Sequence, residues 1–217
     1  MMMTMKSGAI RLCATAVCVA SLGGLLGACA PIVLGGAAMS ALVATDRRTS
    51  GTQLEDEGIE LRSIGRINEN LGSRVHVNVT SYNRQVLLTG EVPSAQDKQL
   101  VEQIVSRVDN VRLVANELAV LGGSSLTQRS SDALVTGKVK ASMVDSKDLF
   151  ANAFKVVTER GVVYLMGRVT QREADRATDI ARSTDRIKKV VRLLEIISEE
   201  ELQRTLPAQS PQTAPKS

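Results

Sequence analysis

The chain has 217 residues and a formal net charge of +4 at pH 7. Two of its cations, Lys6 and Arg11, lie in residues 1–28, which hold no acid, so removal of this segment lowers the charge by two. So weak a net charge gives no argument for nucleic-acid binding. Aromatic residues make up 2% of the chain and tryptophan is absent. Any core is therefore built from Val, Leu, Ile and Ala.

The first segment has the features of an export signal. Lys6 and Arg11 precede an apolar stretch that ends at Leu26, which is typical of a secretory signal peptide. The run from Leu26 through Gly27 and Ala28 to Cys29 resembles the lipobox of bacterial lipoproteins. This resemblance implies cleavage after residue 28 and acylation of Cys29. The alternative is an ordinary signal peptide or a short membrane anchor, although a stable span needs roughly 20 apolar residues.

The lipobox resemblance also predicts the location and the available cysteine chemistry. Ala30 follows Cys29, where an aspartate would favour retention at the inner membrane, so we expect a lipid-anchored protein on the periplasmic face of the outer membrane. Cys13 and Cys18 leave with the signal peptide. The mature chain then has no disulfide, thiol nucleophile or cysteine metal site.

Composition divides the rest of the chain. Residues 29–53 are small and apolar and then polar, which favours a lipidated tether. Gly122 to Ser125 mark a break, which predicts a linker over residues 122–130. The prolines and polar residues of 201–217 favour a disordered tail. Two folded domains are therefore expected, over residues 54–121 and 131–200.

An internal repeat relates these two domains. Val86–Val92 resembles Val163–Val169 at an offset of 77 residues. Ser94 with Asp97, and Thr170 with Glu173, are Ser/Thr-x-x-acid patterns that predict helix starts. We infer a duplicated module.

Each module is predicted to have the order α-β-β-α-β. In the first, apolar residues at helical spacing end at Leu71, and Val75, Val77 and Val79 alternate with polar residues as in a half-buried strand. A strand near Val86, a helix after Ser94 and a strand over residues 111–120 follow. The second module repeats this order, with helices from about Asp132 to Val144 and from Thr170, strands near Phe154 and Val163, and a strand over residues 187–197. Two helices on one face of a three-stranded sheet make an α+β sandwich.

This arrangement resembles the BON domain, which has the same element order and a glycine after the second strand. Two such modules behind a lipobox resemble the dual-BON outer-membrane lipoproteins of enteric bacteria. The likeness is carried by Thr45-Asp46, Thr52-Gln53, Val86-Leu87-Leu88, Val111–Leu118, Thr136, Lys138-Val139, Leu165-Met166-Gly167, Val169-Thr170 and Arg172-Glu173-Ala174. The resemblance implies binding of anionic phospholipid by the second module, support of outer-membrane integrity and association with division sites.

The residues themselves offer no catalytic or cofactor-binding constellation. His76 is the single histidine, and we expect it on a solvated or hydrogen-bonded strand face. The acids Glu55-Asp56-Glu57 are interpreted as first-turn acids that suit a helix dipole. We therefore expect a protein with no enzymatic activity, metal or cofactor.

The second module offers a candidate phospholipid site on its first helix and the segment that follows. The predicted residues mix cations with apolar groups: Leu134, Lys138, Lys140, Met143, Lys147 and Phe150. On a helix, Leu134, Lys138 and Ala141 share one side and Val135, Val139 and Met143 another. The alternative is an ordinary amphipathic helix whose lysines are solvated.

The sequence therefore predicts a periplasm-facing lipoprotein that binds an anionic phospholipid membrane and helps maintain outer-membrane integrity. The alternative is a protein–protein adaptor that touches lipid only through Cys29. Its partners would be the outer-membrane assembly machinery or a cell-wall hydrolase activator.

Overall fold

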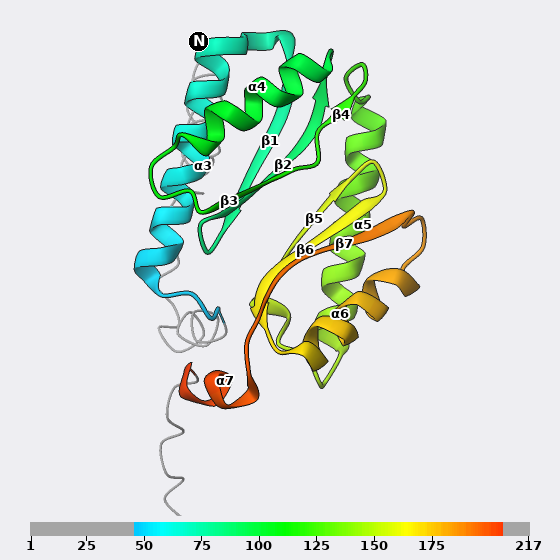
Figure 1. Ribbon diagram of the computed structural model, residues 1–217. Coiled ribbons are helices and arrows are strands. Elements are labelled where there is room, and N and C mark those ends of the chain that lie inside the picture. Colours follow the sequence, from blue (N-terminus) through cyan, green and yellow to red (C-terminus); the bar gives the residue numbers. More distant parts are fainter. Residues whose placement is uncertain (1–45, 206–217) are drawn as a thin grey trace, which may run out of the picture. The chain divides into compact units, whose positions relative to one another are not determined.

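The computed structural model describes residues 46–205, all within one compact unit, Ala41–Ser217 (Figure 1). Cys29, most of the predicted tether and residues 206–217 of the predicted tail lie outside the described residues. In chain order the elements are α3 (Ser50–Leu71), η1 (Gly72–Arg74), β1 (His76–Tyr82), β2 (Gln85–Val92), α4 (Ala95–Ser106), β3 (Leu113–Asn116), β4 (Ala119–Val120), α5 (Leu126–Asp145), η2 (Ala151–Ala153), β5 (Phe154–Glu159), β6 (Val162–Val169), α6 (Gln171–Ser183), β7 (Lys189–Ile196) and α7 (Glu199–Thr205).

The predicted order α-β-β-α-β is confirmed in both modules. In each, the first two strands form an antiparallel hairpin, and the chain returns through a helix to pair in parallel with the second strand (Figure 1). The last strand of the first module is divided into β3 and β4, which pair with β2 one after the other. At the break the side chain of Asn116 accepts a hydrogen bond from the Leu118 N–H, and Leu118 is buried.

Four helices begin at a Ser or Thr N-cap, which accepts a backbone N–H of the first turn. The predicted caps Ser94 and Thr170 are confirmed. Thr49 and Ser125 cap α3 and α5, so these helices begin at Ser50 and Leu126. Both start earlier than expected, and α5 occupies most of the predicted linker.

The early start of α3 changes the role of its acids. Glu55-Asp56-Glu57 lie beyond the first turn, which contains no acid. The interpretation of these acids as partners of the helix dipole is therefore wrong. At the other end of the chain, α7 is helical from Glu199 to Thr205, so the first residues of the predicted tail are ordered.

Each module has its own core between its helices and its sheet. The larger buried members are Ile59, Ile67, Leu71, Val86, Leu88, Val101 and Val105 in the first, and Val135, Val139, Met143, Phe154, Val163, Leu165 and Ile180 in the second. The glycine predicted to follow the second strand lies inside that strand, in β2 and in β6, and the close approach of a neighbouring carbonyl requires it. A Cβ at Gly90 would lie 2.1 Å from the His76 carbonyl oxygen, and one at Gly167 would lie 2.6 Å from that of Ala153.

A third apolar cluster joins the two modules. Tyr82 and Leu87 of the first sheet pack with Tyr164 and Met166 of the second, and all four side chains are buried. Because side chains alternate between the faces of a strand, these residues use the sheet faces that the helices leave uncovered. Each sheet is therefore covered by helices on one face and by the other module on the second.

Candidate functional site

The helix α5 presents an outward face that mixes apolar and cationic side chains. Val135, Val139 and Met143 recur at helical spacing and are buried in the core of the second module. On the opposite side the side chains of Leu134 and Val144 are 67% and 69% exposed. Burial of one stripe thus fixes which residues of α5 meet solvent.

Five of the six residues predicted to bind phospholipid are exposed in the structure, and one is buried. Leu134, Lys138, Lys140, Lys147 and Phe150 are all exposed. Met143 is wrong as a contact residue, because its side chain has 0% exposure inside the core. Val144, which was not among the predicted residues, is also exposed and lies one helical turn after Ala141 on the predicted stripe.

The lysines differ in their surroundings. Within residues 46–205, Lys138 and Lys140 form no ion pair at their exposed positions. Lys147 lies between Asp145 and Asp148 in the sequence, and Asp148 is paired with Arg176 at 3.2 Å. The two predicted lysines on α5 therefore have no acid within one helical turn, whereas Lys147 lies between two acids.

A buried arginine holds the start of the described chain against the second module. Arg47 donates two 2.7 Å hydrogen bonds to the Glu173 carboxylate and one to the Arg168 carbonyl oxygen. Its guanidinium also lies 5.9 Å from the centre of the Phe150 ring. Burial disfavours the Glu173 carboxylate, but these donors and the Thr170 N–H outweigh it and lower its pKa. Residue 47 is therefore part of the fold, not of a free tether.

The neighbouring arginine binds the first module. Arg48 donates to Asp56 at 2.7 Å, and its guanidinium lies 4.3 Å from the centre of the Tyr82 ring. The Asp56 carboxylate also accepts the Asn83 and Arg84 N–H groups of the β1–β2 turn. Arg47 and Arg48 thus reach different modules.

An equivalent aspartate supports the second hairpin. Asp132 of α5 accepts the N–H groups of Arg160 and Gly161 at 2.8 and 2.9 Å. The sequence carries one signal for both residues, since Asp56 and Asp132 share the 76-residue offset of the repeat. Asp132 is therefore a structural residue beside the candidate lipid face.

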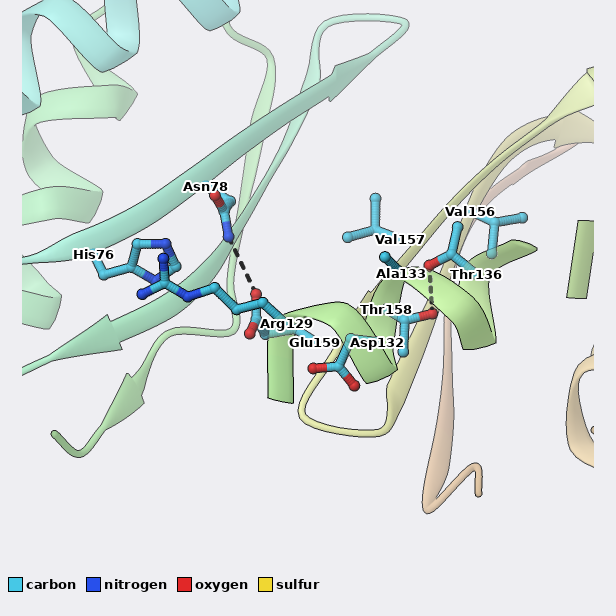
Figure 2. A pocket seen from close by; sticks show the side chains of 10 residues that line it. All are labelled: His76, Asn78, Arg129, Asp132, Ala133, Thr136, Val156, Val157, Thr158 and Glu159. Atoms are coloured by element: carbon cyan, nitrogen blue, oxygen red, sulfur yellow. Dashed lines mark hydrogen bonds between the residues drawn. The ribbon is translucent and has the colours of Figure 1, made fainter. Parts of the chain in front are cut away.

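A cleft of about 560 Å³ lies between the two modules (Figure 2). Its lining residues come from β1, α5 and β5: His76, Asn78, Arg129, Asp132, Ala133, Thr136, Val156, Val157, Thr158 and Glu159. Asn78 donates to the Glu159 carboxylate at 3.2 Å, and the Thr136 hydroxyl donates to that of Thr158 at 2.8 Å (Figure 2). The cleft is therefore lined by polar groups from both modules.

The carboxylates near the cleft have unequal surroundings. Glu91 contacts the His76 ring at 2.9 Å and Arg160 at 3.3 Å, as expected for a hydrogen-bonded histidine. Burial disfavours ionised Glu91, but its donors outweigh burial and lower its pKa. Glu159 has Asn78 as its donor, and burial, followed by repulsion from Glu91, raises its pKa.

The described part of the chain has neither a metal-binding cluster nor a membrane-spanning helix. No group of three or more His, Cys, Asp or Glu side chains within residues 46–205 is arranged to hold a metal ion. None of the helices there combines the length and the apolar character needed to cross a membrane.

Comparison with known proteins places these features in a family. The family model for the BON domain matches residues 56–122 and 131–198, more than half of the chain. The outer membrane lipoprotein DolP of Haemophilus influenzae is 37% identical over 171 residues, which cover 78% of this chain and 89% of that protein.

Two other relatives are more distant. The 21 kDa hemolysin of Actinobacillus pleuropneumoniae is 28% identical over 70% of this chain and 79% of its own length. The osmotically-inducible protein Y of Escherichia coli is 29% identical over 52% of this chain and 58% of its own. With two matched modules and a lipoprotein relative aligned over most of its length, the chain belongs to the BON-domain family, as a dual-BON lipoprotein of the outer membrane that faces the periplasm.

Proposed function

We propose that this chain is a non-enzymatic lipoprotein, acylated at Cys29, whose second module binds anionic phospholipid through the outward face of α5. By this contact it helps maintain outer-membrane integrity, including at division sites. The observation that carries the proposal is the combination of exposed Leu134 and Val144 with the unpaired Lys138 and Lys140 on one helix. Lys147 and Phe150, which are also exposed, follow the end of this helix in the chain.

The expected membrane-binding energies are small enough that the contact depends on a lipid anchor. Each lysine near an anionic leaflet contributes about 1 kcal/mol. A leucine or phenylalanine side chain contributes roughly 1.5–3 kcal/mol on complete burial and less on partial insertion. Such terms give weak binding in free solution, but a lipid anchor raises the local concentration enough to make the contact persistent.

A cationic hollow beside α5 supports recognition of a phosphate headgroup. Lys140 lines a hollow of about 350 Å³ together with Arg48 and Lys155. Arg48 and Lys155 are paired with carboxylates, whereas Lys140 has no ion pair within the described residues. An anionic headgroup next to α5 would therefore meet one uncompensated ammonium group at the edge of a polar hollow.

An adaptor function is the second candidate. It is favoured by α3, where Leu54 and Leu61 are 70% and 72% exposed and Ile64 is 40% exposed. An apolar stripe on the first module suits a protein partner in envelope assembly or in cell-wall hydrolase regulation. In this alternative the lipid contact is limited to Cys29.

Vesicle flotation of a soluble fragment separates these functions. The fragment spans residues 46–205, so that it keeps Arg47, Arg48 and the buried Leu202. Phosphatidylglycerol vesicles should carry it upward at low salt, and phosphatidylcholine vesicles should not. Equal behaviour with both lipids would remove the basis for phospholipid recognition by α5 and leave the adaptor function.

A further inference from the structure

Two strands at sheet edges run beside the cleft of Figure 2. Among the described strands, β1 pairs with β2 alone and β5 with β6 alone. Contacts join Tyr82 to Ala153, Ser81 to Lys155 and Asn78 to Glu159. Residue numbers rise on one strand as they fall on the other, so β1 and β5 lie antiparallel, bridged by side chains and not by a backbone ladder.

The edge of β5 has backbone groups that the sheet does not use. The two-residue turn Arg160-Gly161 makes Glu159 and Val162 the closing hydrogen-bonded pair of the hairpin. Alternation along the strand then directs the N–H and C=O groups of Val156 and Thr158 away from β6. Within the described residues these groups have no hydrogen-bond partner, although the two residues are only 5% and 9% exposed.

Buried backbone groups of this kind require water or another chain as a partner. The cleft beside them has a volume of about 560 Å³, within the roughly 300–1,000 Å³ range of ligand sites. Its α5 wall presents the small side chains of Ala133 and Thr136 (Figure 2). Further along, Lys155 closes the gap by donating to Glu60 and to the Ser81 carbonyl oxygen. The stretch beside Val156 and Thr158, between Lys155 and the bond from Asn78 to Glu159, therefore suits a short extended segment.

The charged groups around the cleft indicate which type of side chain the bound segment should have. Glu159 is buried and accepts one hydrogen bond, from Asn78, whereas Glu91 and Asp132 have several donors each. Of the nearby cations, Arg160 contacts Glu91 and the Arg129 Nε donates to Ser124, and neither forms an ion pair with Glu159 among the described residues. A cation from outside would thus find in Glu159 a carboxylate without an ionic partner among the described residues.

We propose that the cleft binds an extended peptide segment of a partner protein, which adds as a strand to the edge of β5 and places a Lys or Arg side chain beside Glu159. The backbone groups of Val156 and Thr158 supply the main-chain hydrogen bonds, and Glu159 supplies the side-chain preference. Lys155 stops the added strand at one end. This binding mode does not depend on contact between α5 and lipid.

The test uses the mature full-length lipoprotein in detergent micelles and two capped seven-residue peptides of alternating Thr and Val. One peptide has Lys at its centre and the other has Glu. Fluorescence anisotropy should show about tenfold tighter binding of the Lys peptide. At saturation, amide hydrogen exchange at Val156 and Thr158 should slow at least tenfold. N-methylation of alternate amides of the Lys peptide should abolish binding, because it removes the donors of one strand edge.

Two isosteric substitutions test the side-chain preference. Glu159→Gln keeps a group that can bond Asn78 but removes the charge, so the two peptides should then bind within about threefold of each other. Glu57→Gln on the exposed face of α3 is the matched control and should keep the tenfold preference. Unchanged exchange at Val156 and Thr158, equal affinity of the two peptides for the wild-type protein, or no binding at millimolar concentration each overturns the proposal.

Discussion

The first helices of the two modules, α3 and α5, share a scaffold and differ in the charge that they present. Asp56 on α3 and Asp132 on α5 each accept two N–H groups from the hairpin turn of their own module. Both helices also expose large apolar side chains, such as Leu61 at 72% and Leu134 at 67%. Apolar exposure therefore does not distinguish the module proposed to bind lipid from its neighbour.

Ion pairs make the charge difference between α3 and α5 smaller, but in the described part of the chain α3 still presents an unpaired acid and α5 still presents unpaired lysines. Of the four acids in the N-terminal half of α3, Glu55 pairs with Arg62, Asp56 with Arg48 and Glu60 with Lys155, and Glu57 alone is exposed without an ion pair among the described residues. On α5, Lys138 and Lys140 remain unpaired there. The comparison teaches that the fold, not the count of acids, sets the charge that a membrane would meet.

Loss of the anchor should have the largest effect, because it removes membrane attachment from both modules at once. Cys29→Ser eliminates the sulfur that we propose to accept the acyl chain, and each buried CH₂ of such a chain contributes about 0.8 kcal/mol. Fatty-acid labelling should disappear, and the protein should leave the membrane fraction or accumulate as an uncleaved precursor. Unchanged labelling of the variant would show that the lipobox interpretation is wrong.

Substitution of Arg47 should lower the free energy of unfolding more than substitution of Arg48. Arg47→Met leaves Glu173 buried without its cation, which should cost about 3–5 kcal/mol in the free energy of unfolding. Arg48→Met should cost less, because Asp56 keeps hydrogen bonds from Ser81, Asn83 and Arg84. Urea unfolding of the 46–205 fragment measures both. Equal losses would show that the bond between Arg47 and the second module is not the stronger one.

The pH dependence gives a second measure of the same ion pair. The pKa of Glu173 is lowered in the fold, so its stabilising effect is complete above the ordinary value of 4.5 and is lost as the pH falls toward the lowered value. The difference between the wild-type protein and Arg47→Met should therefore shrink below pH 4.5. A constant difference would indicate that Arg47 stabilises the fold by packing alone.

Charge reversal on α5 tests the sign difference between the helices. Exchange of Lys138 and Lys140 for Glu should weaken binding to phosphatidylglycerol vesicles by more than roughly 2 kcal/mol at low salt, and the loss should shrink as salt is added. Lys189→Glu on β7 is an exposed control and should have little effect. Wild-type flotation of the double variant would favour the adaptor function.

Local patterns were sufficient to predict the modules. The caps at Ser94 and Thr170, the paired strands and the second helices follow from side-chain spacing over a few residues, and the structure confirms them. The repeat offset then related the two modules without any knowledge of their packing. Leu134, Lys138 and Lys140 are exposed for the same reason, since helical spacing separates α5 into two faces.

Long-range contacts account for what the sequence did not predict. Nothing near Arg47 in the chain indicates Glu173, 126 residues away, and the sheet-to-sheet cluster joins residues of both modules. Met143 was grouped with the lysines because its flexible side chain suits a lipid surface, yet its helical position belongs to the Val135 and Val139 stripe. Periodicity should have taken precedence over side-chain type at that position.

Single apolar-to-acid substitutions compare the exposed stripes directly. Leu134→Glu should weaken vesicle binding by about 1 kcal/mol, less than the roughly 1.5–3 kcal/mol of complete burial, and with less dependence on salt than the lysine exchange. Leu61→Glu, at a similar exposure on α3, should leave binding unchanged. Folding of both variants is checked by circular dichroism. Equal losses would mean that both first helices insert into the membrane.

An effect of similar size, but on stability, should arise where the two hairpins differ just before their turns. At this position the first module has Tyr82, whose pKa burial raises to about 12, and the second has Glu159, whose pKa burial and Glu91 also raise. Tyr82 is neutral at pH 7 and loses nothing by burial, whereas an ionised Glu159 opposes folding. Its unfavourable contribution grows as the pH rises from the ordinary value of 4.5 toward the raised value.

Glu159→Gln keeps a partner for Asn78 and should therefore raise the free energy of unfolding by about 1 kcal/mol at pH 7. At pH 4 the carboxyl group is largely protonated in the fold, and the gain should nearly vanish. Urea unfolding of the 46–205 fragment at the two pH values gives the comparison, and a variant less stable than the wild-type protein at pH 7 would show that the Glu159 carboxylate has stabilising contacts that outweigh its burial.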